Sequence, residues 1–271
     1  MMRAATTIAA LSSSSRTPAV RGFASSVSGF DLLRQNVGLE QLSVNVTASA
    51  KAELFVPASQ DELLNLYITH EADMGGLTPY YGVVWPSALA LCQHLEIPAQ
   101  SDVLELGSGV GLGGIAAALT CSPNRVLMTD IDPIAVELAK MGSDASGVGD
   151  ICECACLDWN GIESWPSQAF DCVIAADVIY EPEACDSIAR LLGHVLRPGG
   201  TFVLADGKGR VNRERLWQAM LGKGEFEVSE DERVVFAPPL SELGEARGRL
   251  DRELRSETEQ PVVLATFERQ R

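Results

Sequence analysis

Residues 103–111 read Val-Leu-Glu-Leu-Gly-Ser-Gly-Val-Gly, and this stretch decides the fold. A short apolar run that carries one acid, Glu105, leads into three alternate glycines, and a helix-like segment follows over 112–119. Glycine adopts positive φ and lets a ligand approach the backbone closely, and the first turn of a helix offers unpaired N–H groups. The stretch therefore predicts a strand, a tight turn and a helix start that together hold a nucleotide-like ligand.

Two ligand classes suit such a turn. Gly109, Gly111 and Gly114 have the G-x-G-x-x-G spacing of dinucleotide sites, so NAD is one candidate. Glu105 argues against NAD, because a carboxylate at the end of the strand repels a pyrophosphate and attracts an amine. S-adenosylmethionine carries an ammonium and a sulfonium and no phosphate. Asp130 ends the next apolar run, where an acid accepts ribose hydroxyls.

Strand-like and helix-like segments alternate through the rest of the chain. Such alternation predicts an α/β fold with a doubly wound, mostly parallel sheet and helices on both faces. A strand near 225–229 and a closing apolar run over 261–267 predict an antiparallel hairpin, and the insert at 240–256 has helical character. The other expected strands are 102–107, 125–130, 151–157, 170–176 and 201–206, and the expected helices are 112–120, 133–141, 184–196 and 212–221.

Three further segments carry candidate site residues. Trp85 precedes Pro86, which suits the first turn of a helix; it is either an aromatic plug in the core or a lid over a ligand. Asp158 and Trp159 follow the third strand, where an acid accepts the amino group of adenine and an indole covers the ring. The alternative for this pair is a surface turn with a buried tryptophan.

Ala176-Asp177-Val178-Ile179-Tyr180 follows the fourth strand, at the sheet edge where α/β proteins bind ligands. The glycine turn, Glu105 and Asp130, in that order, resemble the class I seven-strand methyltransferases, whose last strand is antiparallel. Asp-x-x-Tyr, together with Trp85-Pro86 and Asp158-Trp159, resembles the family 16 protein-lysine methyltransferases over roughly 79–270. The resemblance implies that Asp177 and Tyr180 face the substrate lysine, and that the S-adenosylmethionine contacts are Trp85, Glu105, Gly107, Ser108, Gly109, Asp130, Asp158, Trp159 and Ala176.

The resemblance implies transfer of a methyl group to a lysine side chain of a protein. Asp177 is expected to orient the ammonium, Tyr180 to hold the amine or the substrate backbone, and no dedicated general base is visible. Three alternatives stay open: a methyltransferase for small molecules on the same fold, an inactive cofactor-binding assembly factor, and an NAD-dependent oxidoreductase. The oxidoreductase would need a proton relay such as Tyr-x-x-x-Lys, which we do not find.

Composition limits the partners. The 271 residues carry a formal net charge of −16, which argues against nucleic acid and favours a partner with a basic, lysine-bearing surface. No apolar run approaches the roughly 20 residues of a membrane span. The seven cysteines do not have disulfide spacing, and Cys152, Cys154 and Cys156 alternate along one expected strand. Alternate strand positions lie along a line, so we expect buried thiols and no metal site.

The chain divides into three parts. Residues 1–30 contain three arginines and no acid, which is typical of a transit peptide, and Arg21-Gly22-Phe23 resembles a mitochondrial processing site. We expect a mitochondrial location, with the chloroplast or the cytoplasm as alternatives. Residues 31–78 form an N-terminal extension with an alternating stretch at 42–46 and helical spacing at 61–70. Residues 79–271 form the expected methyltransferase domain.

Overall fold

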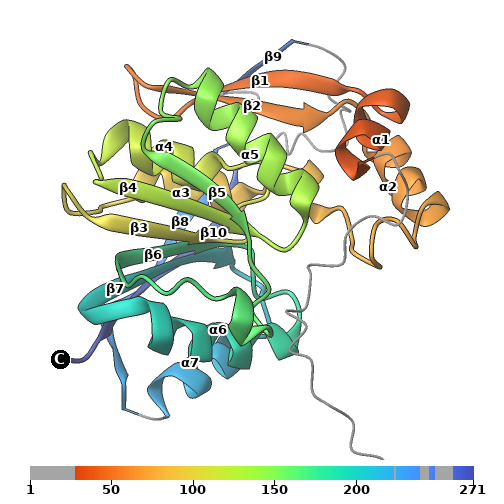
Figure 1. The fold of residues 1–271 in the computed structure, drawn as a ribbon. Helices are drawn as coiled ribbons and strands as arrows, with labels where there is room; N and C mark the ends of the chain where they lie inside the picture. Colours follow the sequence, from red (N-terminus) through yellow and green to blue (C-terminus); the bar gives the residue numbers. More distant parts are fainter. Residues whose placement is uncertain (1–27, 223, 239–243, 248–258) are drawn as a thin grey trace, which may run out of the picture.

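The computed structural model describes residues 28–222, 224–238, 244–247 and 259–271. A seven-stranded sheet with the order β5-β4-β3-β6-β7-β10-β8 runs through the molecule (Figure 1). β10 pairs antiparallel with β7 and β8, and the pairs among the other strands are parallel, so the expected mostly parallel sheet with an antiparallel last strand is confirmed. The strands are β3 (Asp102–Leu106), β4 (Arg125–Asp130), β5 (Cys152–Cys156), β6 (Phe170–Ala176), β7 (Leu196–Gly207), β8 (Phe226–Ala237) and β10 (Gln260–Arg269).

Helices cover both faces of this sheet, which explains why its central strands are mostly apolar. In β3 the side chains of Val103, Leu104 and Leu106 are all fully buried, although they point to opposite faces. Two clusters of buried side chains result, one on each face. One face carries α3 (Pro86–His94), α4 (Leu112–Thr120) and α5 (Pro133–Ala145), and the other carries α6 (Pro182–Val195) and α7 (Arg213–Leu221).

The turn expected at Arg197-Pro198-Gly199-Gly200 lies inside β7. Pairing begins at Leu196 opposite Phe170 and resumes at Thr201 opposite Cys172, so the residues between them bulge out of the ladder. Gly199 has φ +79°, which a residue with a side chain adopts with strain. These residues therefore interrupt the ladder as a turn would, but β7 begins before them, at Leu196, and not after them.

The N-terminal extension forms a second, smaller sheet. Its elements are α1 (Gly29–Asn36), β1 (Leu39–Asn45), β2 (Lys51–Pro57) and α2 (Gln60–Thr69), which confirm the strand and helix expected there. β1 also pairs with β9 (Gly244–Arg247), from the insert between β8 and β10. The helical character expected for the insert is wrong for this segment, and 240–243 and 248–256 lie outside the described residues.

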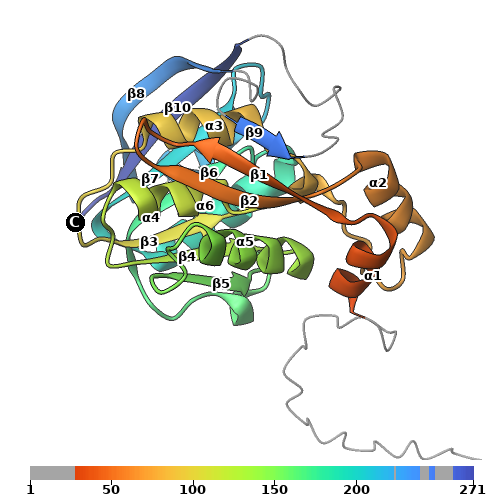
Figure 2. The same ribbon diagram turned by 90° about the horizontal axis from the view of Figure 1, so that it is seen from above.

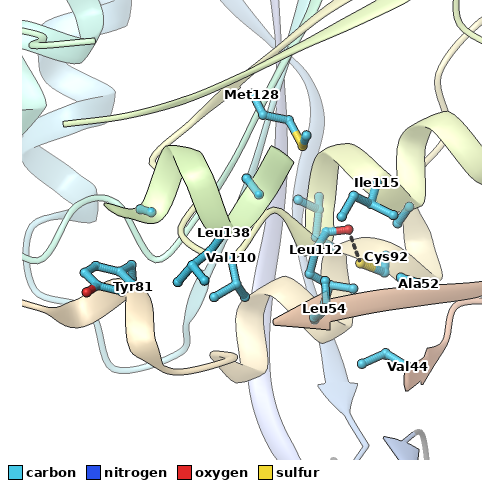
Figure 3. Packing of buried hydrophobic residues seen from close by; sticks show 14 of the residues in the cluster. Val44, Ala52, Leu54, Tyr81, Cys92, Val110, Leu112, Ile115, Met128 and Leu138 are labelled. Atoms are coloured by element: carbon cyan, nitrogen blue, oxygen red, sulfur yellow. Dashed lines mark hydrogen bonds between the residues drawn. The ribbon is translucent and has the colours of Figure 1, made fainter. Parts of the chain in front are cut away.

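The small sheet packs on the large one through α4 and α5 (Figure 2). Val44, Ala52 and Leu54 of the small sheet belong to the same buried cluster as Ile115 of α4 and Leu138 of α5 (Figure 3). The extension therefore shares one hydrophobic core with the expected methyltransferase domain. The expected boundary at residue 78 does not divide the structure into two separate cores. The expected boundary at residue 30 falls inside α1, and residues 1–27 lie outside the description.

The alternating thiols lie on β5 as expected, and Cys152 is the fully buried one among them. Burial raises the pKa of Cys152 to about 12 and that of Cys154 to about 11, so both thiols stay protonated at neutral pH. In the described ranges, no three His, Cys, Asp or Glu side chains gather as metal ligands would. Within those same ranges, each helix is too short or too polar to cross a bilayer.

Gly142 marks the closest approach of α5 to β2. A Cβ at Gly142 would lie 3.0 Å from the carbonyl oxygen of Glu53 and 3.0 Å from Cδ1 of Ile115. We expect Gly142→Ala to lower the free energy of unfolding by roughly 1 kcal/mol or more, since overpacking outweighs the helix propensity of alanine. Gly193→Ala on α6 is the matched control, because its Cβ would meet only the mobile end of Glu225. Urea unfolding that shows both variants equally stable would contradict this packing.

Candidate functional site

The glycine turn is fastened to the strand beside it. The amide of Ser108 donates to the carbonyl of Thr129 at 2.8 Å, and the amide of Gly109 donates to Oδ2 of Asp130 at 2.9 Å. Gly107 and Gly109 have φ of +62° and +53°. A Cβ at Gly107 would lie 2.8 Å from Val178 and would abut the ring of Trp159. The turn thus has one shape, and its inner side has no room for a side chain.

Asp130 lies at the carboxyl end of β4, as its position in the sequence predicts. Its Oδ1 accepts from the amide of Asp132 at 3.0 Å, while Oδ2 holds the amide of Gly109. Burial raises the pKa of Asp130, and these amides oppose that rise. A carboxylate has about four lone-pair sites, and the amides of Gly109, Ile131 and Asp132 leave one of them free. Asp130 can therefore hold the turn and still accept a hydrogen bond from a ligand hydroxyl.

Glu105 of β3 accepts a hydrogen bond from the first turn of α4. Its side chain is only 3% exposed, and its Oε2 accepts from the amide of Gly114 at 2.9 Å, within the first turn of that helix. A carboxylate there satisfies an unpaired N–H group and complements the helix dipole. Burial raises the pKa of Glu105 to about 8. Its contact with the cofactor's amino group stays a prediction, and the structure adds this anchoring role.

A buried network that the sequence reading missed joins the extension to this site. The hydroxyl of Tyr67 on α2 donates to Oδ2 of Asp132 at 2.5 Å and lies 3.1 Å from the hydroxyl of Tyr81. Asp132 caps α5 through the amide of Ile134 at 2.8 Å. Burial raises the pKa of Asp132 to about 6. Asp132 before Pro133 is a recognisable helix cap, but nothing local pointed to its partner 65 residues away.

Three exposed aromatic side chains stand near the turn. Trp85 is 40% exposed, and its Nε1 donates to the carbonyl of Tyr80 at 3.1 Å. The rings of Tyr80 and Tyr180 meet edge to face with centroids 5.2 Å apart. The plug interpretation of Trp85 is therefore wrong, because a core plug would be buried. Its role as a lid stays a prediction.

Asp158 and Trp159 differ in their hydrogen bonding. Asp158 Oδ1 accepts from the amide of Asn160 at 2.8 Å, so this carboxylate is used by its own turn. Trp159 is half-buried beside Gly107, and its Nε1 is buried with no partner among the described residues. Its indole therefore lies at the glycine turn, as the strand order predicted.

Asp177 leaves the end of β6 in a left-handed conformation, with φ +53°. Its amide donates to the carbonyl of Ala205 at 3.0 Å. Its Oδ1 accepts from Nη2 of Arg210 at 2.9 Å. From the sequence, this carboxylate is expected to orient a substrate ammonium. Its contact with Arg210 is not predicted by the sequence. Ala176 ends β6 one residue earlier, paired with Ala205 of β7.

These residues fit a ligand with hydroxyls and a positive charge. The hydroxyl of Ser108 is buried without a partner among the described residues, and so is Nε1 of Trp159, although buried polar groups are normally paired. Both belong to segments that meet at Gly107, where a Cβ would press against Val178 and the ring of Trp159. The residues gathered around the turn therefore fit S-adenosylmethionine, with no phosphate to neutralise.

Comparisons with known proteins agree with this geometry. A family model described as lysine methyltransferase matches residues 66–223. The electron transfer flavoprotein beta subunit lysine methyltransferase of Danio rerio is 31% identical over 140 residues, which cover 50% of this chain and 52% of that protein. Protein N-lysine methyltransferase METTL21A of Danio rerio is 31% identical over 156 residues, covering 55% and 69%. The chain spans about half the length of the first of these relatives.

One solved structure supports the fold alone. It is described as "Conversion of a Disulfide Bond into a Thioacetal Group during Echinomycin Biosynthesis" and is 17% identical to this chain. The likeness covers 78% of this chain and 93% of that chain, with a TM-score of 0.51.

Removing the Tyr67 hydroxyl tests the buried network. We expect Tyr67→Phe to lower the free energy of unfolding by about 1–3 kcal/mol, because it leaves the buried carboxylate of Asp132 short of a donor. Tyr80→Phe is the matched control, since the Tyr80 ring is 49% exposed. Equal losses in the two variants, measured by denaturant unfolding at neutral pH, would show that the network contributes nothing.

The raised pKa of Glu105 predicts a pH dependence of stability. Because the folded pKa lies above the usual value of about 4.3, the contribution of Glu105 is complete below that value and is lost as pH rises towards 8. Between about pH 5 and pH 9 the wild type should lose more stability than Glu105→Gln, by roughly 1.4 kcal/mol per unit of pKa shift. Parallel stability curves for the two proteins would contradict the burial of this carboxyl.

Proposed function

Since the chain belongs to the lysine methyltransferase family, we propose that it transfers the methyl group of S-adenosylmethionine to a lysine side chain of a protein. The observation that carries this proposal is the glycine turn held to Asp130, beside polar atoms of Ser108 and Trp159 that have no partner within the part of the chain that the structure describes. The Ser108 hydroxyl can accept from an ammonium, and Nε1–H of Trp159 can donate to an oxygen of the cofactor. The small-molecule methyltransferase and the inactive assembly factor are the alternatives that the experiment below separates.

We assign the cofactor's parts to the residues as follows. Gly107, Ser108 and Gly109 lie beside its amino-acid part, Asp130 accepts from its ribose hydroxyls, and Trp159 covers its adenine. When bound, the cofactor supplies a methyl group on a positively charged sulfur. Asp158 is assigned to the adenine amino group through the lone pairs that its turn leaves free. Glu105 lies behind the turn, where it accepts from the amide of Gly114, and Trp85 and Ala176 complete the contacts.

The chain's own residues position the acceptor amine. Methyl transfer is an in-line displacement that needs a neutral amine about 3 Å from the methyl carbon. We assign Asp177 and Tyr180 to the substrate side, because both follow β6 at the carboxyl edge of the sheet. Tyr180 is 44% exposed, so its hydroxyl is accessible to an incoming side chain. The proton of the amine leaves to water, because the assigned residues include no general base.

The partner is proposed to be a protein with a basic, lysine-bearing surface, drawn by the net charge of −16. The relatives' names specify different targets, electron transfer flavoprotein beta subunit and EEF1A, so we transfer neither to this chain. A mitochondrial location is proposed from the arginine-bearing, acid-free composition of residues 1–30.

Labelled S-adenosylmethionine tests the proposal. The purified chain is incubated with mitochondrial extract and the labelled cofactor, and the products are separated into protein and small molecules. We expect one labelled protein band whose label resides on lysine. Asp130→Ala should give no band and no cofactor binding in calorimetry, because the turn and the ribose lose their shared acceptor, and Asp150→Ala on an exposed turn is the control. Label in a small molecule favours the first alternative, and cofactor binding without any transfer favours the second.

A further inference from the structure

The ion pair between Arg210 and Asp177 bears on how the substrate amine loses its proton. We propose that Arg210 is a positioning residue that compensates the charge of Asp177, so that the lysine amine can reach the methyl group in its neutral form. The inference rests on the proposed function and deepens it. It identifies the residue that lets the turn carrying Asp177 bind a lysine amine without keeping that amine protonated.

Arg210 bridges two carboxylates. Its Nη2 donates to Oδ1 of Asp177 at 2.9 Å, and its Nε donates to Oδ1 of Asp206 at 3.0 Å. Asp206 is fully buried and also accepts from Nη2 of Arg213 at 3.1 Å. Two carboxylates and two guanidiniums therefore balance in one cluster. Without Arg210 the cluster would carry a net negative charge, and the unpaired one would be Asp177.

The cluster has a fixed geometry. The backbone of Asp177 is fixed by the bond from its amide to the carbonyl of Ala205. Its side chain is only 10% exposed and is held by Arg210. Nδ2 of Asn212 donates to the carbonyl of Ile179 at 2.9 Å and fastens the segment after β7 to the Asp-x-x-Tyr turn. A pocket of about 390 Å³ opens along that segment, lined by Tyr180, Arg210, Asn212 and Pro261 among others. The guanidinium therefore lies at the wall of a space beside the proposed acceptor site.

The need for compensation follows from the acid–base chemistry of lysine. The free amine has a pKa of about 10.4, and only its neutral form has the lone pair that attacks. A carboxylate within about 4–6 Å raises that pKa by one to three units. An uncompensated Asp177 would thus hold the substrate as an inert ammonium. Paired with Arg210, Asp177 keeps an acceptor oxygen for the amine but adds little net charge.

Other charged groups lie around the same turn and must be kept constant. Arg213 on α7 and Asp206 on β7 belong to the cluster itself. Burial raises the pKa of Tyr180, and the charges of Glu181, Asp130 and Tyr80 raise it further. Lys208 lines the same pocket. A change confined to Arg210 leaves all of these in place, so a shifted pH profile reports the charge that Arg210 carries.

The test is the pH profile of methyl transfer by the full chain. The rate of label transfer to the protein band is measured at saturating cofactor for wild type, Arg210→Met and Arg210→Lys. We expect the rising limb of the Arg210→Met profile to move up by about one pH unit, which makes transfer about tenfold slower near neutral pH and restores it at high pH. Arg210→Lys keeps the charge and should retain the wild-type profile.

Two controls keep the outcome interpretable. Adding Asp177→Asn to Arg210→Met should return the limb to its wild-type position, whatever rate remains, and Arg210→Gln replaces the Met variant if that variant does not fold. An unshifted limb in the folded variant, or faster transfer near neutral pH, would overturn the inference while the proposed function stands. No transfer by the wild type at any pH would overturn the proposed function, and the inference with it.

Discussion

The hydrogen bond from the Gly109 amide to the Asp130 carboxylate is the constraint on which the site depends. It joins the turn after β3 to the end of β4, and the bond from Ser108 to Thr129 reinforces it. The turn needs positive φ to make these bonds, which is why glycine occupies it. With the turn fixed, Trp159 and Val178 can approach Gly107 from the neighbouring strand ends. The shape of the proposed cofactor site therefore follows from two strands and the bonds between their ends.

The chain stabilises its buried acids in two ways, and the difference separates the two halves of the site. Asp130 and Asp132 accept from backbone amides, and no side-chain cation takes part in those contacts. Glu105 also accepts from a backbone amide, but burial raises its pKa to about 8, so this carboxyl stays mostly protonated at neutral pH. Asp177 and Asp206 accept from arginines. An uncompensated acidic half suits a cationic cofactor. A compensated half suits an amine that must become neutral before it reacts.

Local sequence patterns predicted the parts of this architecture that local physics controls. The glycine turn, the acid ending β4 and the alternation of strands and helices are all short-range features, and the structure contains them where the sequence placed them. Pairing between distant segments could not be read in the same way. Nothing near Arg210 indicates that it meets Asp177, 33 residues earlier. Likewise the composition around β9 favours a helix, and the pairing of Gly244–Arg247 with β1 makes this segment a strand.

We propose that the glycine turn and Asp130, at the carboxyl edge of the sheet, bind a cationic methyl donor in preference to a dinucleotide. Calorimetric titration of the same protein preparation with S-adenosylmethionine and with NAD tests it directly. We expect saturable binding of S-adenosylmethionine that is weaker in Asp130→Asn, and no binding of NAD at comparable concentration. Saturable binding of NAD with none of S-adenosylmethionine would contradict it.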